Sequence, residues 1–111
     1  MHKLTSWCAM GLVGTFGFAF PAVGADTGPG KAKADAVCAV CHGVQGIATL
    51  PNAPNLAGQP QIYLAEQLKN YRSGKRLHEV MSVIAKPLSD QDIENISAWY
   101  ASLQLELRES K

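Results

Sequence analysis

Two cysteines, Cys38 and Cys41, are followed directly by His42, and these three residues have the types and spacing best suited to chemistry. Two thiols on one turn can each form a thioether with one vinyl group of a porphyrin. The imidazole beside the second thiol can then reach the central iron. C-x-x-C-H is the attachment signature of a c-type haem. The motif therefore predicts one covalently attached haem c, with His42 as an iron ligand.

Other interpretations of the cysteine pair fit the surrounding sequence less well. A thioredoxin-like redox pair requires a βαβ setting, and no strand-like alternation surrounds Cys38. A closed zinc site requires four ligands, usually from two separated pairs, and the chain has no second C-x-x-C pair. The only other cysteine, Cys8, lies far upstream.

The first 25 residues have the pattern of a cleaved secretory signal peptide. A positively charged start at Lys3 precedes an apolar stretch over residues 4–20, and small side chains at residues 23–25 precede the expected cleavage point. The stretch is shorter than the roughly 20 residues of a membrane-spanning helix. An uncleaved membrane anchor is the alternative. We expect export to the periplasm, a single domain over residues 26–111, and no integral membrane segment after cleavage.

The composition of residues 26–111 excludes some functions. Loss of Lys3 changes the formal net charge from +1 to zero, so a strongly basic nucleic-acid-binding face is not expected. Only the two motif cysteines remain, so no disulfide framework can form. The domain is small enough to be marginally stable alone, and a buried haem would supply apolar surface for packing.

The patterning predicts an all-α fold of three main helices. The first is expected over about residues 30–40, the second over 60–73 and ended by Gly74, and the third from Ser89 onward with Asp92 completing a capping box. Ile93, Ile96, Trp99, Tyr100 and Leu103 would form the apolar stripe of this last helix. Residues 43–59 and 75–88 are predicted to be loops.

The order of these segments resembles the small class I cytochromes c, and most closely the single-haem unit that is doubled in cytochrome c4 of bacterial periplasms. The resemblance is carried by Met81 and by residues 38–43, 54–59, 63–68, 71–76, 88–93 and 98–101. With one haem motif, the sequence is not expected to be the dihaem protein itself.

The resemblance implies a class I cytochrome c fold around one covalent haem, with the first and last helices crossing. Gly30 would lie at the crossing, opposite Trp99, although it could instead belong to a flexible lead-in. Pro54 would offer its carbonyl to the second ring nitrogen of His42, its alternative role being a simple turn proline. Leu56 would pack on the haem, and Met81 would be the second axial ligand of the iron.

The numbers of methionines and histidines limit the candidates for the second iron ligand. After removal of the signal, Met81 is the only methionine, and His42 and His78 are the only histidines. His/Met ligation raises the reduction potential of a haem. The competing interpretation is bis-histidine ligation through His78, which is otherwise expected to be a solvent-facing loop residue.

The one basic cluster comprises Lys69, Arg72, Lys75 and Arg76. It could be a solvated helix end, where cations complement the helix dipole, or it could pair with haem propionates or an acidic partner.

The predicted function is transfer of single electrons between redox partner proteins, such as a dehydrogenase, an oxidase or a reductase. The chain would act without an enzyme activity of its own, as a monomer or as a subunit of a complex. A cytochrome subunit of a larger dehydrogenase, for example a sulfide-oxidising flavocytochrome, is the first alternative. A haem-based gas sensor or ligand-binding protein with an open iron is the second.

Overall fold

A computed structural model describes residues 14, 17–19 and 26–109 of the chain. It contains five helices in these ranges: α1 (Gly28–Val37), α2 (Ala39–His42), α3 (Gln61–Ser73), α4 (Met81–Ala85) and α5 (Asp90–Ser102). No strand occurs in the described part of the chain. The predicted all-α fold with three main helices is therefore confirmed. The signal peptide predicted for residues 1–25 lies almost entirely outside the described residues.

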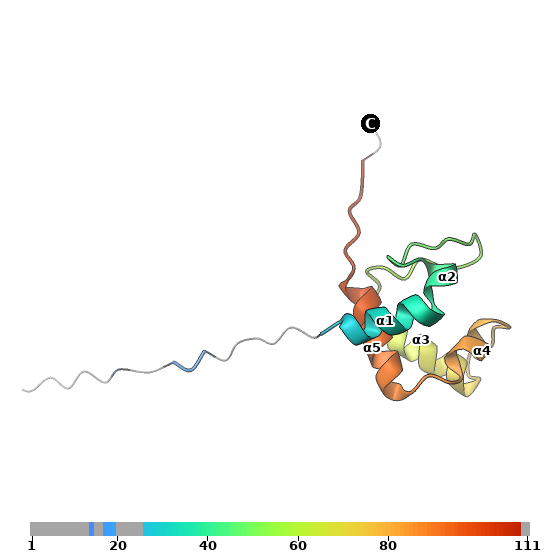
Figure 1. The fold of residues 1–111 in the computed structure, drawn as a ribbon, viewed down its shortest axis with the longest axis horizontal. Helices are drawn as coiled ribbons and strands as arrows, with labels where there is room; N and C mark the ends of the chain where they lie inside the picture. Colours follow the sequence, from blue (N-terminus) through green and yellow to red (C-terminus); the bar gives the residue numbers. More distant parts are fainter. Residues whose placement is uncertain (1–13, 15–16, 20–25, 110–111) are drawn as a thin grey trace, which may run out of the picture.

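The first and last main helices cross, as Figure 1 shows, and α3 packs against both α5 and α4. Gly30 is buried in α1 at this crossing. A Cβ atom at this position would overlap the carbonyl oxygen of Asn95 and approach the Cβ of Trp99 to 3.1 Å. The crossing role predicted for Gly30 is therefore confirmed, because only glycine lets the two backbones approach this closely.

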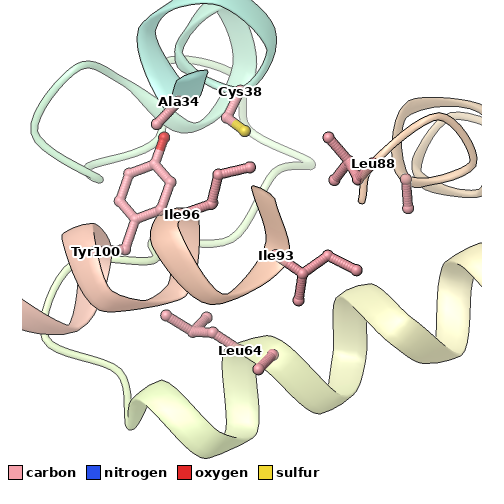
Figure 2. Packing of buried hydrophobic residues seen from close by; sticks show 9 residues of the cluster. Ala34, Cys38, Leu64, Leu88, Ile93, Ile96 and Tyr100 are labelled. Atoms are coloured by element: carbon pink, nitrogen blue, oxygen red, sulfur yellow. The ribbon is translucent and has the colours of Figure 1, made fainter. Parts of the chain in front are cut away.

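The core lies where α5 meets α1 and α3. Figure 2 shows Tyr100 and Ile96 of α5 directed toward α1, while Ile93 and Leu64 meet between α5 and α3. Ile93 is fully buried, and Tyr100 and Ile96 are nearly so. Trp99 and Leu103 pack against this cluster at partial exposure. The predicted apolar stripe of the last helix therefore faces the core.

The ends of α3 and α5 follow the expected capping chemistry. Gly74 ends α3 in the left-handed conformation with φ of 81°, as glycine commonly does after a helix. At the start of α5, the Ser89 hydroxyl accepts a hydrogen bond from the Asp92 amide, and the Asp92 carboxylate accepts one from the Ser89 amide. The predicted capping box is therefore present.

Two predictions of local structure were wrong. The first helix begins at Gly28 and is interrupted at Cys38, after which α2 forms a separate short turn. The segment predicted as a loop over residues 75–88 contains α4. A five-residue helix spans little more than one turn, which is too short to produce a recognisable apolar period.

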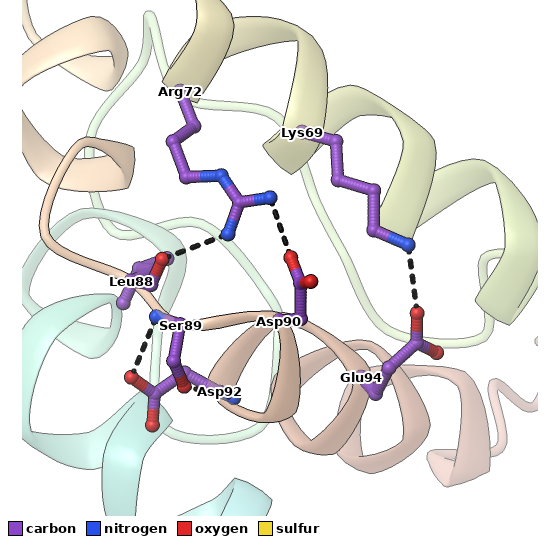
Figure 3. A network of polar contacts seen from close by, with 7 residues as sticks. All are labelled: Lys69, Arg72, Leu88, Ser89, Asp90, Asp92 and Glu94. Carbon is purple, nitrogen blue, oxygen red and sulfur yellow. Dashed lines mark hydrogen bonds and ion pairs between the residues drawn. The ribbon is translucent and has the colours of Figure 1, made fainter.

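Polar contacts join α3 to the start of α5 (Figure 3). The Arg72 guanidinium donates to the Leu88 carbonyl at 2.9 Å and to the Asp90 carboxylate at 2.6 Å. Lys69 pairs with Glu94 at 3.0 Å. Half of the basic cluster is therefore used inside the molecule to fix one helix against another, a role that neither interpretation of the cluster included.

No helix among the described residues combines the length and apolar character needed to cross a bilayer.

Candidate haem site

The motif residues form one tight turn at the end of α1. The Cys38 amide still donates to the Ala34 carbonyl of α1, at 2.8 Å, and the Cys38 carbonyl then accepts from the His42 amide at 3.0 Å. Cys38, Cys41 and His42 all line the same cavity. This is the arrangement that two thioethers and a neighbouring iron ligand require.

Gly43 ends this turn in a conformation that other residues adopt with difficulty. Its φ is 78°, and a Cβ atom there would overlap the carbonyl oxygen of Ile47. The chain therefore reverses directly after His42. Thr49 closes the reversal, because its amide donates to the Cys41 carbonyl at 3.0 Å and its hydroxyl to the Val40 carbonyl at 2.9 Å. Thr49 was not predicted as a site residue, because a threonine in a loop gives little sign of such a partner.

The tautomer of His42 follows from its partner. Its Nδ1 atom lies 2.8 Å from the carbonyl oxygen of Pro54. A carbonyl oxygen can only accept, so Nδ1 must carry the proton. In a neutral ring the lone pair is then on Nε2, as a histidine that binds a metal through that atom requires. The imidazole is 6% exposed, and the contact with Pro54 fixes its orientation.

The loop that presents Pro54 is held by its own hydrogen bonds. The Asn55 side chain accepts from the Ala48 amide at 2.7 Å, and Gln59 donates to the Asn55 carbonyl at the same distance. The Gly46 carbonyl accepts from the Leu56 amide at 2.8 Å. Leu56 packs against the core cluster and lines the cavity. Residues 43–59 thus form a defined loop that places Pro54 and Leu56 beside the motif.

The cavity beside the motif has a volume of about 410 Å³, within the usual range for small-molecule and cofactor sites. Most of its wall is apolar. The aliphatic side chains that line it come from α1, α3, α4, α5 and the loop over residues 43–59. They include Val37, Leu56, Leu64, Leu68, Ile84 and Ile96. Such a wall suits a flat, largely apolar macrocycle and limits the access of water to it.

The lining of the cavity also includes Met81, the first residue of α4. His78 lines the same cavity but differs from His42 in its hydrogen bonds. Its Nδ1 atom lies 3.2 Å from the backbone nitrogens of both Val80 and Met81. Backbone N–H groups can only donate, so the Nδ1 atom of His78 carries a lone pair, and in the neutral ring the proton is on Nε2. The two histidines therefore have opposite tautomers.

Burial disfavours the charged forms of two groups that line the cavity, Cys38 and Tyr100. Loss of hydration raises the pKa of the Cys38 thiol to about 11, so the sulfur is uncharged near neutral pH. Burial likewise raises the pKa of Tyr100 above its usual value. The environment of Cys38 therefore suits a neutral sulfur, as a thioether is.

Arg76 of the basic cluster lies at the edge of the cavity. It donates to Gln67 at 2.9 Å, and its guanidinium lies 4.7 Å from the centroid of the Tyr71 ring. Of the basic cluster, Arg76 alone lines the cavity.

Together these features define a class of protein. Two thiols, an imidazole hydrogen-bonded through Nδ1, and a thioether all line one apolar cavity. The fold is helical, and its first and last main helices cross at a glycine. The residues fit a covalently attached haem, and the fold and site together are those of a c-type cytochrome.

Comparison with known proteins gives the family. The family model described as Cytochrome c matches residues 28–104, so the chain belongs to the cytochrome c family. Covalent haem c with its iron is accordingly the cofactor.

Individual relatives include cytochromes c4 and an electron-acceptor protein. Cytochrome c4 of Thiocapsa roseopersicina is 43% identical over 84 residues, which cover 76% of this chain and 43% of that protein. A thiosulfate dehydrogenase electron acceptor of Thiomonas intermedia is 38% identical over 98 residues, covering 86% of this chain and 43% of that protein.

The crystal structure of reduced recombinant cytochrome c4 from Pseudomonas stutzeri has a TM-score of 0.66 with this chain, at 39% identity. The match covers 73% of this chain and 47% of that one. The chain thus spans less than half the length of these relatives.

Proposed function

We propose that the chain carries single electrons between redox partner proteins, through a haem iron bound by His42 and Met81. The observation that carries this proposal is that the two axial candidates, from α2 and α4, line one apolar cavity and both have side chains suitable as donors to iron. When bound, haem iron supplies a one-electron ferric/ferrous couple, and a soft thioether ligand favours the ferrous state.

In this proposal Cys38 and Cys41 form the thioethers, and His42 is the proximal ligand. The hydrogen bond from His42 Nδ1 to the Pro54 carbonyl supports this role, because a bond of that kind fixes the ring and makes the other nitrogen a stronger donor. Leu56 packs against the macrocycle from the same loop.

The tautomers favour Met81 over His78 as the second ligand. His78 would have to give up its contacts with the Val80 and Met81 amides, or bind the metal through an Nε2 atom that carries a proton. Met81 needs no such change, since a thioether sulfur has lone pairs at any pH.

The test is Met81→Ala in the mature haem protein. We expect the ferric wild type to have the weak near-infrared sulfur-to-iron band and a positive reduction potential, and the ferrous wild type not to bind carbon monoxide. Met81→Ala should lose the band, lower the potential and bind carbon monoxide. Rapid stoichiometric carbon monoxide binding by the ferrous wild type would instead support a sensor or ligand-binding function.

The domain boundary and the location form part of the same proposal. We propose that residues 1–25 are removed on export and that the mature periplasmic protein begins at Asp26, as the charged start, apolar stretch and small residues before Asp26 suggest. The intact mass of the protein recovered from a periplasmic extract should equal residues 26–111 plus one haem. Recovery of the uncleaved chain in the membrane fraction would support an anchor instead.

The Thiomonas relative suggests a class of partner. We propose that a dehydrogenase acting on an inorganic sulfur compound donates electrons to this chain, because that relative is named as the electron acceptor of thiosulfate dehydrogenase. Catalytic amounts of such a dehydrogenase with thiosulfate should reduce the ferric protein, and thiosulfate alone should not. Failure of reduction in the complete mixture would exclude this donor while leaving the electron-transfer proposal intact.

A further inference from the structure

His78 makes a reciprocal set of hydrogen bonds with the segment that begins α4. Its Nδ1 atom accepts from the amides of Val80 and Met81, each at 3.2 Å. In return, the His78 amide donates to the Ser82 hydroxyl at 3.0 Å. The Ser82 amide donates to the His78 carbonyl at 2.9 Å. His78 and Ser82 therefore bracket Met81 on both sides.

These contacts replace a cap that α4 otherwise lacks. The residue at the N-cap position is Val80, whose side chain cannot accept a hydrogen bond. The first amides of a helix have no partner within it, and a side-chain acceptor usually satisfies them. The His78 Nδ1 atom does this here, and one of the two amides it satisfies belongs to Met81 itself.

The His78 ring is in turn held from α3. It meets the Tyr71 ring edge-on, with 6.3 Å between centroids and 74° between planes. Arg76 covers the Tyr71 ring at 4.7 Å from its centroid. Although His78 is exposed to solvent, its orientation is thus supported by a rigid helix, and the support extends through Nδ1 to the Met81 backbone.

We propose that His78 is a positioning residue, whose Nδ1 atom holds the Val80 and Met81 amides and thereby keeps the Met81 sulfur directed into the cavity. This inference rests on the proposed function, in which Met81 is an axial ligand. A methionine on a loosely held segment leaves the iron more often, and an added ligand can then take its place. His78 therefore controls how firmly the coordination stays closed, without touching the iron.

Side-chain geometry supplies a discriminating set of variants. The Nδ1 atom of histidine and the Oδ1 atom of asparagine are both bonded to Cγ, so His78→Asn places an acceptor where Nδ1 was. His78→Gln carries its polar atoms one bond further out, and His78→Ala has none. Leu77→Ala is the matched control, because Leu77 is 82% exposed and is not among the residues that line the cavity.

The measurement is a titration of the ferric mature protein with imidazole, followed by loss of the sulfur-to-iron band. Without imidazole, all variants should retain the band. His78→Ala and His78→Gln should be half displaced at about fivefold lower imidazole than wild type, as expected for loss of a typical helix cap. His78→Asn and Leu77→Ala should match wild type. Hydrogen exchange at the Val80 and Met81 amides should accelerate in His78→Ala, whereas exchange at Ile96 in α5 should not change.

The outcomes separate this inference from the function on which it rests. A wild type without the band overturns both. A wild type with the band, but the same imidazole midpoint in His78→Ala, overturns only the role of His78. Equal weakening by His78→Asn and His78→Ala would also overturn it, because the acceptor at Nδ1 would then not be the group responsible.

Discussion

Identical imidazole rings acquire different properties here from the groups around them. His42 faces a carbonyl oxygen and His78 faces two amides, so the first ring has its proton on Nδ1 and the second on Nε2. The C-x-x-C-H spacing distinguishes His42 from His78 in the sequence, but nothing in the sequence around His78 indicates that it caps the segment of Met81.

Gly30 is a position where one added carbon should be damaging. In Gly30→Ala, the new Cβ would meet the Asn95 backbone, which cannot move without shifting α5. We expect a loss of about 2 kcal/mol in the free energy of unfolding, because overpacking outweighs the better helix propensity of alanine. Denaturant unfolding of the haem protein measures it.

Gly28→Ala is the control for this substitution. Gly28 begins the same helix, and a Cβ there would meet only the flexible Asp26 side chain. A similar loss of stability in Gly28→Ala and Gly30→Ala would contradict the crossing explanation.

At the scale of the helices, the sequence specifies the start of α5 most clearly, because Ser89 and Asp92 form a capping box there. The box lowers the pKa of Asp92, chiefly through the hydrogen bond from the Ser89 amide. A carboxylate whose pKa is lowered by folding stabilises the protein above its unfolded pKa, and the stabilisation is lost as the pH falls through the folded value.

Asp92→Asn should therefore be less stable than wild type by a pH-dependent amount. We expect a difference below about 1 kcal/mol at low ionic strength, constant between about pH 5 and 8. It should shrink as the pH falls below about 4, where the carboxylate becomes protonated. Urea unfolding of both proteins across this range would test it, and a difference that grew on acidification would contradict the assignment.

For the molecule as a whole, a small core lies beside the cavity. Among the described residues, the largest fully buried side chains are Tyr100, Ile93 and Ser97. Apolar side chains from several segments instead line the cavity. A domain of this size is only marginally stable through its own burial of surface, so the haem is expected to contribute a large part of the folding free energy.

Replacing both motif cysteines tests this dependence. Cys38→Ser with Cys41→Ser should yield a chain without covalent haem, reduced helical circular dichroism and no cooperative thermal transition. Cys41→Ser alone keeps one possible thioether and should retain haem and a transition at lower temperature. A doubly substituted, haem-free chain with a sharp transition would show that the protein core is sufficient.

The three main helices, the capping box of α5 and the C-x-x-C-H motif at residues 38–42 could be predicted from the sequence, because each depends on local signals. Apolar spacing, a cap residue and a five-residue motif all act within one or two turns of chain. The first-helix break at Cys38 was missed, and so was α4, whose five residues are too few to produce a recognisable apolar period.

Contacts between distant segments decided the rest. Pro54 as the partner of His42 and Gly30 at the helix crossing were expected only from the family resemblance, because each contact joins distant segments. The orientation of His78, which depends on Tyr71 of α3, was not expected at all. The sequence identified Lys69 and Arg72 as members of a basic cluster. Their ion pairs with Glu94 and Asp90 of α5 depend on the packing of α3 beside α5. Residue types reveal which chemistry is available, whereas hydrogen-bond partners and close approaches arise only when the chain has folded, because they join groups that the sequence keeps apart.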